Sequence, residues 1–320
     1  MNKINLMEVC KGANRIGISA HIRPDGDAVG SCLALYHYLK HCMPEAYVKV
    51  FLENPPACFS KMKGIEDIDS QFPEQEPFDV FFVLDVAKDQ ERLGEATKYF
   101  EQAKKTVNID HHISNARGSG DVNYVLPEAA ATCQVLFELM DQQWMNAKVA
   151  EALYVGIIHD CGVFQYSNTT PRTLEVAANL VSYGFNFSQL IEETFYEKTY
   201  LQNQLLGRAL MESIRFMEGR CIVSCVDRKT MEFYGATSAD LDGIVNQLRN
   251  TKGVDCAVFM YEISPMTFKV SLRSNEKLDV SKVAGFFGGG GHVRAAGCTL
   301  NGTFHDVINN VSAQIEKWIQ

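Results

Sequence analysis

The chain has 320 residues, of which 46% are hydrophobic, and it carries a formal net charge of −9 at pH 7. This length and composition predict a folded globular protein of two domains and exclude a disordered chain. The acidic balance argues against a long nucleic-acid groove, which needs clustered Lys and Arg, and no apolar run reaches the roughly 18 residues of a membrane span.

The N-terminus has no apolar region of the kind that marks a signal peptide. The ten cysteines include no CxxC pair and show no disulfide-like spacing. Such usage is typical of reduced, buried thiols, so we expect a cytoplasmic protein.

The first half of the chain alternates strand and helix patterns. Strands are predicted at 15–22, 47–53, 78–87 and 105–112. Helices are predicted at 28–42, 127–143, 146–162 and 169–184. The run 78–87 is mostly apolar, as in strands buried on both faces. This alternation predicts an α/β fold with a doubly wound, mostly parallel sheet.

The last third of the chain predicts a second, smaller α/β domain across a cleft from the first. A helical pattern over 201–219 leads into strands at 220–226, 255–264 and 267–274. Helices are predicted at 238–250 and 303–320. We expect a first domain over 1–192, a linker helix region over 193–204 and a second domain over 205–320.

Charged residues of the first half gather at the ends of predicted elements. They are His21, Asp25 and Asp27 after the first strand, Asp85 in 78–87, Asp110, His111 and His112 at the end of 105–112, and Asp160 near the end of a helix. In an open α/β sheet, ligands bind beyond the carboxyl ends of the strands, so these segments are expected to converge. Taken singly, Asp25-Gly26-Asp27 is also a common surface turn, and Asp85 a common helix cap.

Metal binding explains the set as a whole. Four neighbouring aspartates repel one another unless cations lie between them, and two divalent cations would balance their charge. Histidine nitrogen mixed with carboxylate oxygen suits Mn²⁺ better than Mg²⁺. Two metals about 3.5–4 Å apart activate water and stabilise both oxygens of an in-line displacement at phosphorus. The pattern therefore predicts two Mn²⁺ per active site. His159 should point elsewhere on its helix and is interpreted as structural.

The second domain contains a candidate phosphate site. Glycines let backbone amides approach an anion, and a helix beginning after them would add its positive end. The candidate residues are Gly288, Gly289, Gly290, Gly291 and His292, together with Arg273, whose guanidinium group is suited to bind phosphate. Alone, the glycines are more typical of a flexible loop and Arg273 of a surface residue.

Five stretches resemble, in order, the motifs of the DHH/DHHA1 phosphoesterases: "HIRPDGDAVGS", "VLDVAKDQERL", "NIDHHISN", "YVGIIHDCGVF" and "GGGGHVRAAG". The resemblance covers nearly the whole chain. With its compact two-domain length, the chain most resembles the NrnA-type enzymes. These are cytoplasmic bacterial nanoRNases that degrade short oligoribonucleotides and often dephosphorylate 3′-phosphoadenosine 5′-phosphate (pAp).

The resemblance also implies residue roles. It implies that one Mn²⁺ is held by His21, Asp25 and Asp85, and the other by Asp27, Asp85, His111 and Asp160, with Asp85 bridging. It implies that His112 contacts the scissile phosphate and that Asp110 orients the histidine pair. The substrate phosphate would bind Arg273, the glycines 288–291 and His292. His159 departs from the family pattern, in which a small hydroxyl residue often precedes the aspartate.

We therefore expect a phosphoesterase that hydrolyses short oligoribonucleotides to mononucleotides and pAp to AMP, acting as a homodimer without a membrane partner. A cyclic-dinucleotide pathway phosphodiesterase, cleaving linear diadenylate or c-di-AMP, would use the same motifs and stays open. A RecJ-like exonuclease would need a further nucleic-acid-binding domain, and an inorganic pyrophosphatase would lack the glycine run. The alternative that is not an enzyme is a non-catalytic nucleotide sensor. The absence of a metal-ligand residue from the sequence would favour it.

Overall fold

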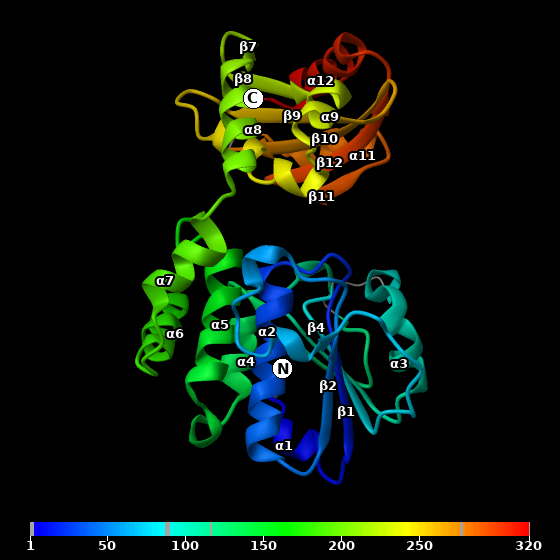
Figure 1. Cartoon of the computed structure of the whole chain (residues 1–320), viewed down its shortest axis with the longest axis vertical. Helices are drawn as coiled ribbons and strands as arrows, with labels where there is room; N and C mark the ends of the chain where they lie inside the picture. The colour runs from blue at the N-terminus through cyan, green and yellow to red at the C-terminus, as the bar shows by residue number, and fades with distance from the viewer. Residues whose placement is uncertain (1–2, 87–89, 116, 276–277, 320) are drawn as a thin grey trace. The chain divides into compact units, whose positions relative to one another are not determined.

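In the computed structural model the chain divides into two compact units, Met1–Glu197 and Lys198–Gln320. The structure describes residues 3–86, 90–115, 117–275 and 278–319, without the side chains of 90–92 and 292. Each unit contains one six-stranded sheet (Figure 1). Within the described residues, no helix combines the length and apolar character that crossing a bilayer requires.

The sheet of the first unit is entirely parallel, which confirms the predicted fold class. Its strands are β1 (Arg15–Ser19), β2 (Tyr47–Phe51), β3 (Ile68–Asp69), β4 (Val80–Leu84), β5 (Thr106–Asp110) and β6 (Val122–Val125). They lie in the order β3-β2-β1-β4-β5-β6. The order reverses between β1 and β4, and ligands of doubly wound sheets bind beyond the carboxyl ends of strands at such a switch point.

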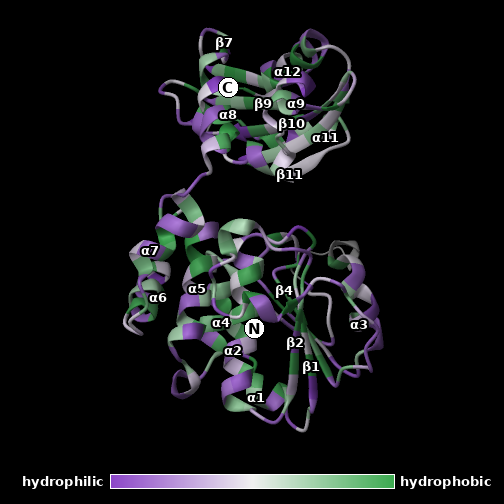
Figure 2. Cartoon of the chain, viewed as in Figure 1, coloured by the Kyte–Doolittle hydropathy of each residue, from purple (hydrophilic) through white to green (hydrophobic). Residues whose placement is uncertain are grey.

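Helices cover both faces of this sheet. They are α1 (Leu6–Val9), α2 (Gly26–Cys42), α3 (Thr97–Gln102), α4 (Thr132–Leu139), α5 (Ala147–Asp160), α6 (Pro171–Val181) and α7 (Phe187–Ile191). Figure 1 shows α2, α4 and α5 on one face and α3 on the other. Because both faces are covered, β4 and β5 are buried along their whole length. Figure 2 shows hydrophobic residues, in green, on the strands and on the helices that cover them.

Short 3-10 and π turns connect these elements: η1 (Ala57–Phe59), η2 (Ile65–Asp67), η3 (Gln90–Ala96), η4 (Ile113–Asn115), η5 (Gln142–Trp144), η6 (Glu192–Tyr196) and, in the second unit, η7 (Ser238–Leu241). The side chain of Asn146 caps α5, and that of Thr170 caps α6 with a proline directly after it.

Helices α2 and α5 approach each other closely at Gly30. A Cβ atom on Gly30 would lie 2.6 Å from the carbonyl oxygen of Ala152 and 2.9 Å from the amide nitrogen of Gly156. Only glycine fits at such a separation between backbones. The contact lies one turn beyond Asp27 on α2 and one turn before Asp160 on α5, so it brings these two carboxylates together.

The sheet of the second unit is mixed. Its strands are β7 (Ile214–Phe216), β8 (Cys221–Val226), β9 (Cys256–Ser264), β10 (Thr267–Ser274), β11 (Gly290–His292) and β12 (Ala295–Asn301). They lie in the order β11-β12-β10-β9-β8-β7, with only β8 and β9 parallel. Its helices are α8 (Tyr200–Met211), α9 (Arg228–Tyr234), α10 (Ile244–Arg249), α11 (Val280–Phe286) and α12 (Phe304–Trp318).

Three predictions for the second unit were wrong in detail. The helical pattern predicted over 201–219 ends with α8 at Met211, and β7 follows it. The predicted helix 238–250 is divided into η7 and α10, because Gly243 between them takes a φ of 84°. The glycines 288–291 are not followed by a helix: they follow α11 and lead into the hairpin of β11 and β12. At Gly291, with a φ of 144°, a Cβ atom would clash with the carbonyl oxygen of Ala295. Backbone packing against β12 therefore replaces the helix N-terminus expected there.

Candidate metal centre

The acidic and histidine residues predicted in the first half converge at the carboxyl edge of the parallel sheet. Three overlapping groups have donor atoms within 4.8 Å of one another. They are Asp85 with His111 and His112, His21 with Asp25 and Asp85, and Asp27 with His111 and Asp160. All the residues predicted as metal ligands are among them.

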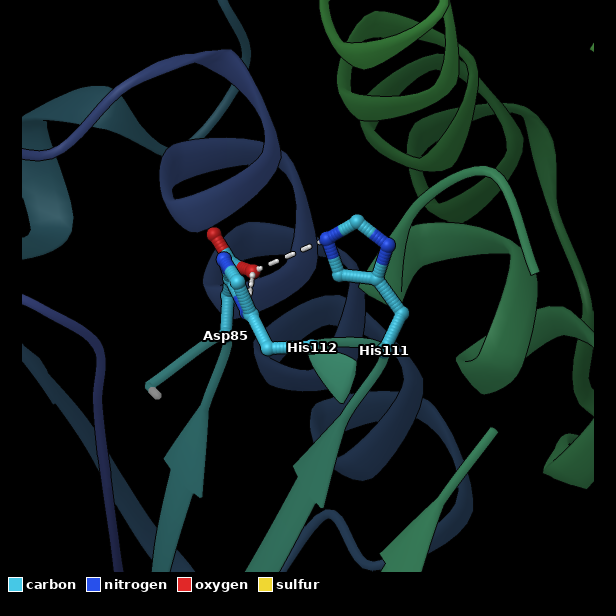
Figure 3. A group of neighbouring side chains, drawn as sticks. All are labelled: Asp85, His111 and His112. Atoms are coloured by element: carbon cyan, nitrogen blue, oxygen red, sulfur yellow. Dashed lines mark ion pairs between the residues drawn. The ribbon is translucent and has the colours of Figure 1, made fainter. Parts of the chain in front are cut away.

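Asp85 lies at the centre of the set. Its Oδ1 is 3.6 Å from Nε2 of His111 and 3.5 Å from Nδ1 of His112, and its Oδ2 is 3.4 Å from Nε2 of His21 (Figure 3 shows the first two). Asp85 is 2% exposed and directly follows β4 with a φ of 55°. A left-handed conformation at a residue other than glycine is strained, and such strain clusters at functional sites.

Asp27 binds the start of α4. Its carboxylate accepts hydrogen bonds from the backbone amides of Thr132, at 2.6 Å, and Cys133, at 2.9 Å. The N-cap residue of α4, Ala131, has no side chain that could do this. The hydroxyl of Thr132 donates to Oδ1 of Asp85 at 3.1 Å. Thr132 was not predicted as a site residue; the signal for it was a lone hydroxyl residue between Ala131 and a helical apolar run.

The remaining predicted ligands come from helix ends. Asp25 is the N-cap of α2 and accepts the amides of Asp27 and Ala28 through Oδ1, each at 3.1 Å. Its Oδ2 lies 3.7 Å from Nε2 of His21. Asp160 ends α5, with its Oδ2 3.2 Å from Nε2 of His111.

Asp110 and His112 form a close pair beside Asp85. Oδ1 of Asp110 lies 2.7 Å from Nδ1 of His112 and accepts the backbone amides of His111 and His112. Burial would raise the pKa of Asp110, but the His112 and Asn115 hydrogen bonds lower it. Asp110 is therefore an ionised carboxylate that holds the His112 ring. His159 instead points toward Thr194, with its Nε2 3.2 Å from the hydroxyl.

The charges of the centre call for a cation. Burial and the neighbouring Asp27 together raise the pKa of Asp85 to about 6. Burial also raises the pKa of Asp27 and of Asp160 to about 6. Burial would lower the pKa of His111, but Asp160 and the other carboxylates raise it to about 10.

Without a metal, the protonated side chains of His21 and His111 thus supply the positive charge among these carboxylates. A divalent cation would take over that role, and mixed nitrogen and oxygen donors suit a transition metal. The residues present fit a divalent metal centre.

The predicted phosphate-binding residues of the second unit lie in one region of its sheet. Arg273 on β10 pairs with Ala295 on β12, which in turn pairs with His292 on β11, so the three backbones share one row. The side chain of His292 lies outside the described part of the structure. The Arg273 guanidinium donates to Oδ1 of Asn246 and to the carbonyl oxygen of Leu272, each at 3.1 Å. The glycines 288, 290 and 291 are exposed.

Comparison with known proteins places both units in one family. Residues 15–157 match the DHH family, N-terminal domain, and residues 218–320 match the DHHA1 domain. The chain is 34% identical to the bifunctional oligoribonuclease and PAP phosphatase NrnA of Thermus thermophilus, over 90% of this chain and 84% of that protein. It is 28% identical to the protein of the same description from Bacillus subtilis, over 93% of each.

Among solved structures, an exopolyphosphatase-related protein from Bacteroides fragilis matches with a TM-score of 0.87 at 25% identity. The match covers 98% of this chain and 94% of that one. These relatives confirm the resemblance that the five motifs indicated. The chain belongs to the DHH/DHHA1 family of phosphoesterases and is a hydrolase of that family.

Proposed function

We propose that this protein hydrolyses short oligoribonucleotides to mononucleotides and pAp to AMP, using two Mn²⁺ ions. The relatives from Thermus thermophilus and Bacillus subtilis, described as bifunctional oligoribonuclease and PAP phosphatase, support this substrate class. We also propose that it works as a homodimer in the cytoplasm.

The position of Asp85 carries the proposal. Its two carboxylate oxygens face different histidines: Oδ2 lies 3.4 Å from His21, and Oδ1 lies 3.6 Å from His111. A carboxylate between two donor groups can bridge two cations. In the proposed centre, Asp25 completes the His21 side, and the buried Asp27 and the half-buried Asp160 complete the His111 side.

Bound divalent cations would lower the pKa of water and polarise the phosphate oxygens. The chain's own residues supply orientation and a proton. Burial would lower the pKa of His112, but its hydrogen bond with Asp110 and the nearby Asp85 raise it. A protonated His112, oriented by Asp110 through Nδ1, is suited to protonate the leaving oxygen.

In the second unit, we propose that Arg273, the glycines 288–291 and His292 bind a phosphate of the substrate. The row formed by Arg273, Ala295 and His292 supports this, since it brings two of the predicted contributors, Arg273 and His292, to one end of the sheet. Exposed glycine amides near an arginine fork are suited to a phosphate oxygen. Such a site needs few Lys and Arg side chains, which agrees with the net charge of −9.

The test is a product time course of the purified protein with Mn²⁺. The substrates are pAp, an RNA dinucleotide, a long single-stranded RNA, and linear and cyclic diadenylate. We expect AMP from pAp and mononucleotides from the dinucleotide, with slow turnover of the long RNA. Preference for the long RNA, or for cyclic diadenylate over pAp and the dinucleotide, would contradict the proposal.

Two matched variants accompany the time course. Asp85→Asn removes the proposed bridging carboxylate and should abolish turnover. Asp141→Asn changes an aspartate that caps η5 outside the site, where asparagine caps equally well, so it should turn over like the unmodified protein.

A further inference from the structure

Asn115 is a buried polar residue that the proposed reaction does not use directly. It ends η4, just after β5, and is 1% exposed. Its side-chain Nδ2 has two hydrogens and lies near three acceptors, so one hydrogen is shared between two of them: Oδ2 of Asp110 at 2.7 Å, Oδ1 of Asn108 at 2.8 Å and the carbonyl oxygen of Val86 at 3.0 Å. One amide group therefore joins the ends of two strands, β4 and β5.

The first of these contacts immobilises Asp110. Its Oδ2 is held by Asn115, and its Oδ1 is held by the ring and backbone amide of His112. A carboxylate with both oxygens occupied cannot rotate without leaving a buried donor unpaired, which is costly. The orientation of the His112 ring thus depends on Asn115 through Asp110.

The other two contacts immobilise the backbone around Asp85. Val86 follows Asp85 directly, and its carbonyl oxygen accepts from Asn115. Asn108, the third acceptor, donates its own Nδ2 to the carbonyl oxygen of Val83 at 3.3 Å. The two asparagines therefore bind the backbone on both sides of Asp85, where φ is 55°. A strained conformation persists only where the surrounding structure enforces it.

We infer that Asn115 is a positioning residue, whose side-chain amide sets the geometry of Asp85 and of the Asp110–His112 pair at the same time. The expected effect on kcat rests on the proposed function. A second effect is independent of activity, because Asp85 belongs to the candidate metal centre: disturbing Asn115 should weaken metal binding. Outer partners of metal ligands commonly have such effects.

The test compares Asn115→Ser and Asn115→Asp with the matched pair Asn123→Ser and Asn123→Asp. Serine shortens the side chain, and aspartate keeps its shape but removes the amide donor. Asn123 lies on the neighbouring strand β6, and the hydrogen bonds of its side chain to described residues go to the backbone of Gly120. The readouts are kcat and KM for pAp below the unfolding temperature, and Mn²⁺ affinity by calorimetry.

For both Asn115 variants we expect kcat to fall about tenfold to 100-fold with KM little changed. We expect Asn115→Ser, which adds no charge, to bind Mn²⁺ about tenfold more weakly. A purely structural role predicts lower unfolding free energy with kcat and Mn²⁺ affinity equal to those of the Asn123 variants; that result would overturn the inference. If the unmodified protein hydrolyses neither pAp nor a dinucleotide, the proposed function fails, and the Mn²⁺ affinities alone decide the role of Asn115.

Discussion

The backbone amide of Thr132 donates a 2.6 Å hydrogen bond to Oδ2 of Asp27, a residue 105 positions earlier in the chain. The same threonine donates its hydroxyl to Asp85. The start of α4 therefore joins two of the carboxylates proposed to bind metal. Both carboxylates are buried, so their orientation depends on such donors.

Replacing Thr132 with valine tests this connection. Thr132→Val keeps the shape and the backbone amide but removes the hydroxyl that faces Asp85. Because the buried Asp85 oxygen loses a donor, we expect the free energy of unfolding to fall by about 1–3 kcal/mol. Mn²⁺ affinity, measured by calorimetry, should fall about tenfold.

Thr173→Val is the control, since the buried Thr173 hydroxyl donates to Oε1 of Gln134 rather than to Asp27 or Asp85. It should lower stability and leave Mn²⁺ affinity unchanged. Equal Mn²⁺ affinities for the two valine variants would show that the Thr132 hydroxyl does not position Asp85.

Asp85→Asn should have opposite effects on stability and on metal binding. Burial raises the pKa of Asp85 from 3.8 to about 6, so the ionised carboxylate is disfavoured in the metal-free protein. At pH 8 we expect the neutral amide to raise the free energy of unfolding of the metal-free protein by about 1–3 kcal/mol. Mn²⁺ affinity should fall more than about 100-fold. Chemical denaturation with a chelator and calorimetry measure the two effects; retained Mn²⁺ affinity would exclude Asp85 as a ligand.

Metal binding should strengthen as pH rises, because protons and cations compete for the same atoms. The pKa values of Asp27, Asp85 and Asp160 are raised to about 6, and those of His21 and His111 to about 10. We expect Mn²⁺ to raise the unfolding temperature more at about pH 8 than at about pH 5, where the carboxyl groups hold protons.

In the metal-free protein, the carboxyl groups of Asp27, Asp85 and Asp160 should instead make stability fall as pH rises. Their pKa values in the folded protein lie above the ordinary value of 3.8, so the folded state binds protons more tightly. Their contribution to stability is complete below about pH 4 and is lost as pH rises through about 6. Thermal denaturation with a chelator or with Mn²⁺ across this range measures both trends. Mn²⁺ shifts of equal size at the two pH values would contradict the competition.

Gly30→Ala should separate α2 from α5 and thereby disturb the centre. The added Cβ atom would lie 2.6 Å from the carbonyl oxygen of Ala152, so a backbone must move. We expect a loss of about 1–3 kcal/mol in the free energy of unfolding, measured by urea denaturation. Gly207→Ala, within α8 and with open space around it, should instead stabilise by about 0.5–1 kcal/mol. A neutral Gly30→Ala would mean that the two helices can separate at no cost.

Several features were predictable because they depend on local patterns. The alternation of strands and helices indicated a parallel sheet, and the carboxyl ends of such strands share one edge. His21, Asp85 and His111 follow three of these strands, so their convergence needed only the topology. Asp160 was placed with them because it ends α5.

Other features depend on which segments pack together. Thr132 was missed because Asp85, the partner of its hydroxyl, is 47 positions away. Asn115 is close in sequence to Asp110, but its contact with Val86, 29 positions away, follows from the packing of β4 beside β5. A helix was expected after Gly291, where pairing with β12 instead produces a strand. The sequence by itself determined the fold class and the residue types at the sheet edge, since periodicity and turn residues act locally. Only the tertiary structure decided which donors orient the buried carboxylates, because hydrogen bonds between distant segments follow from packing rather than from spacing in the chain.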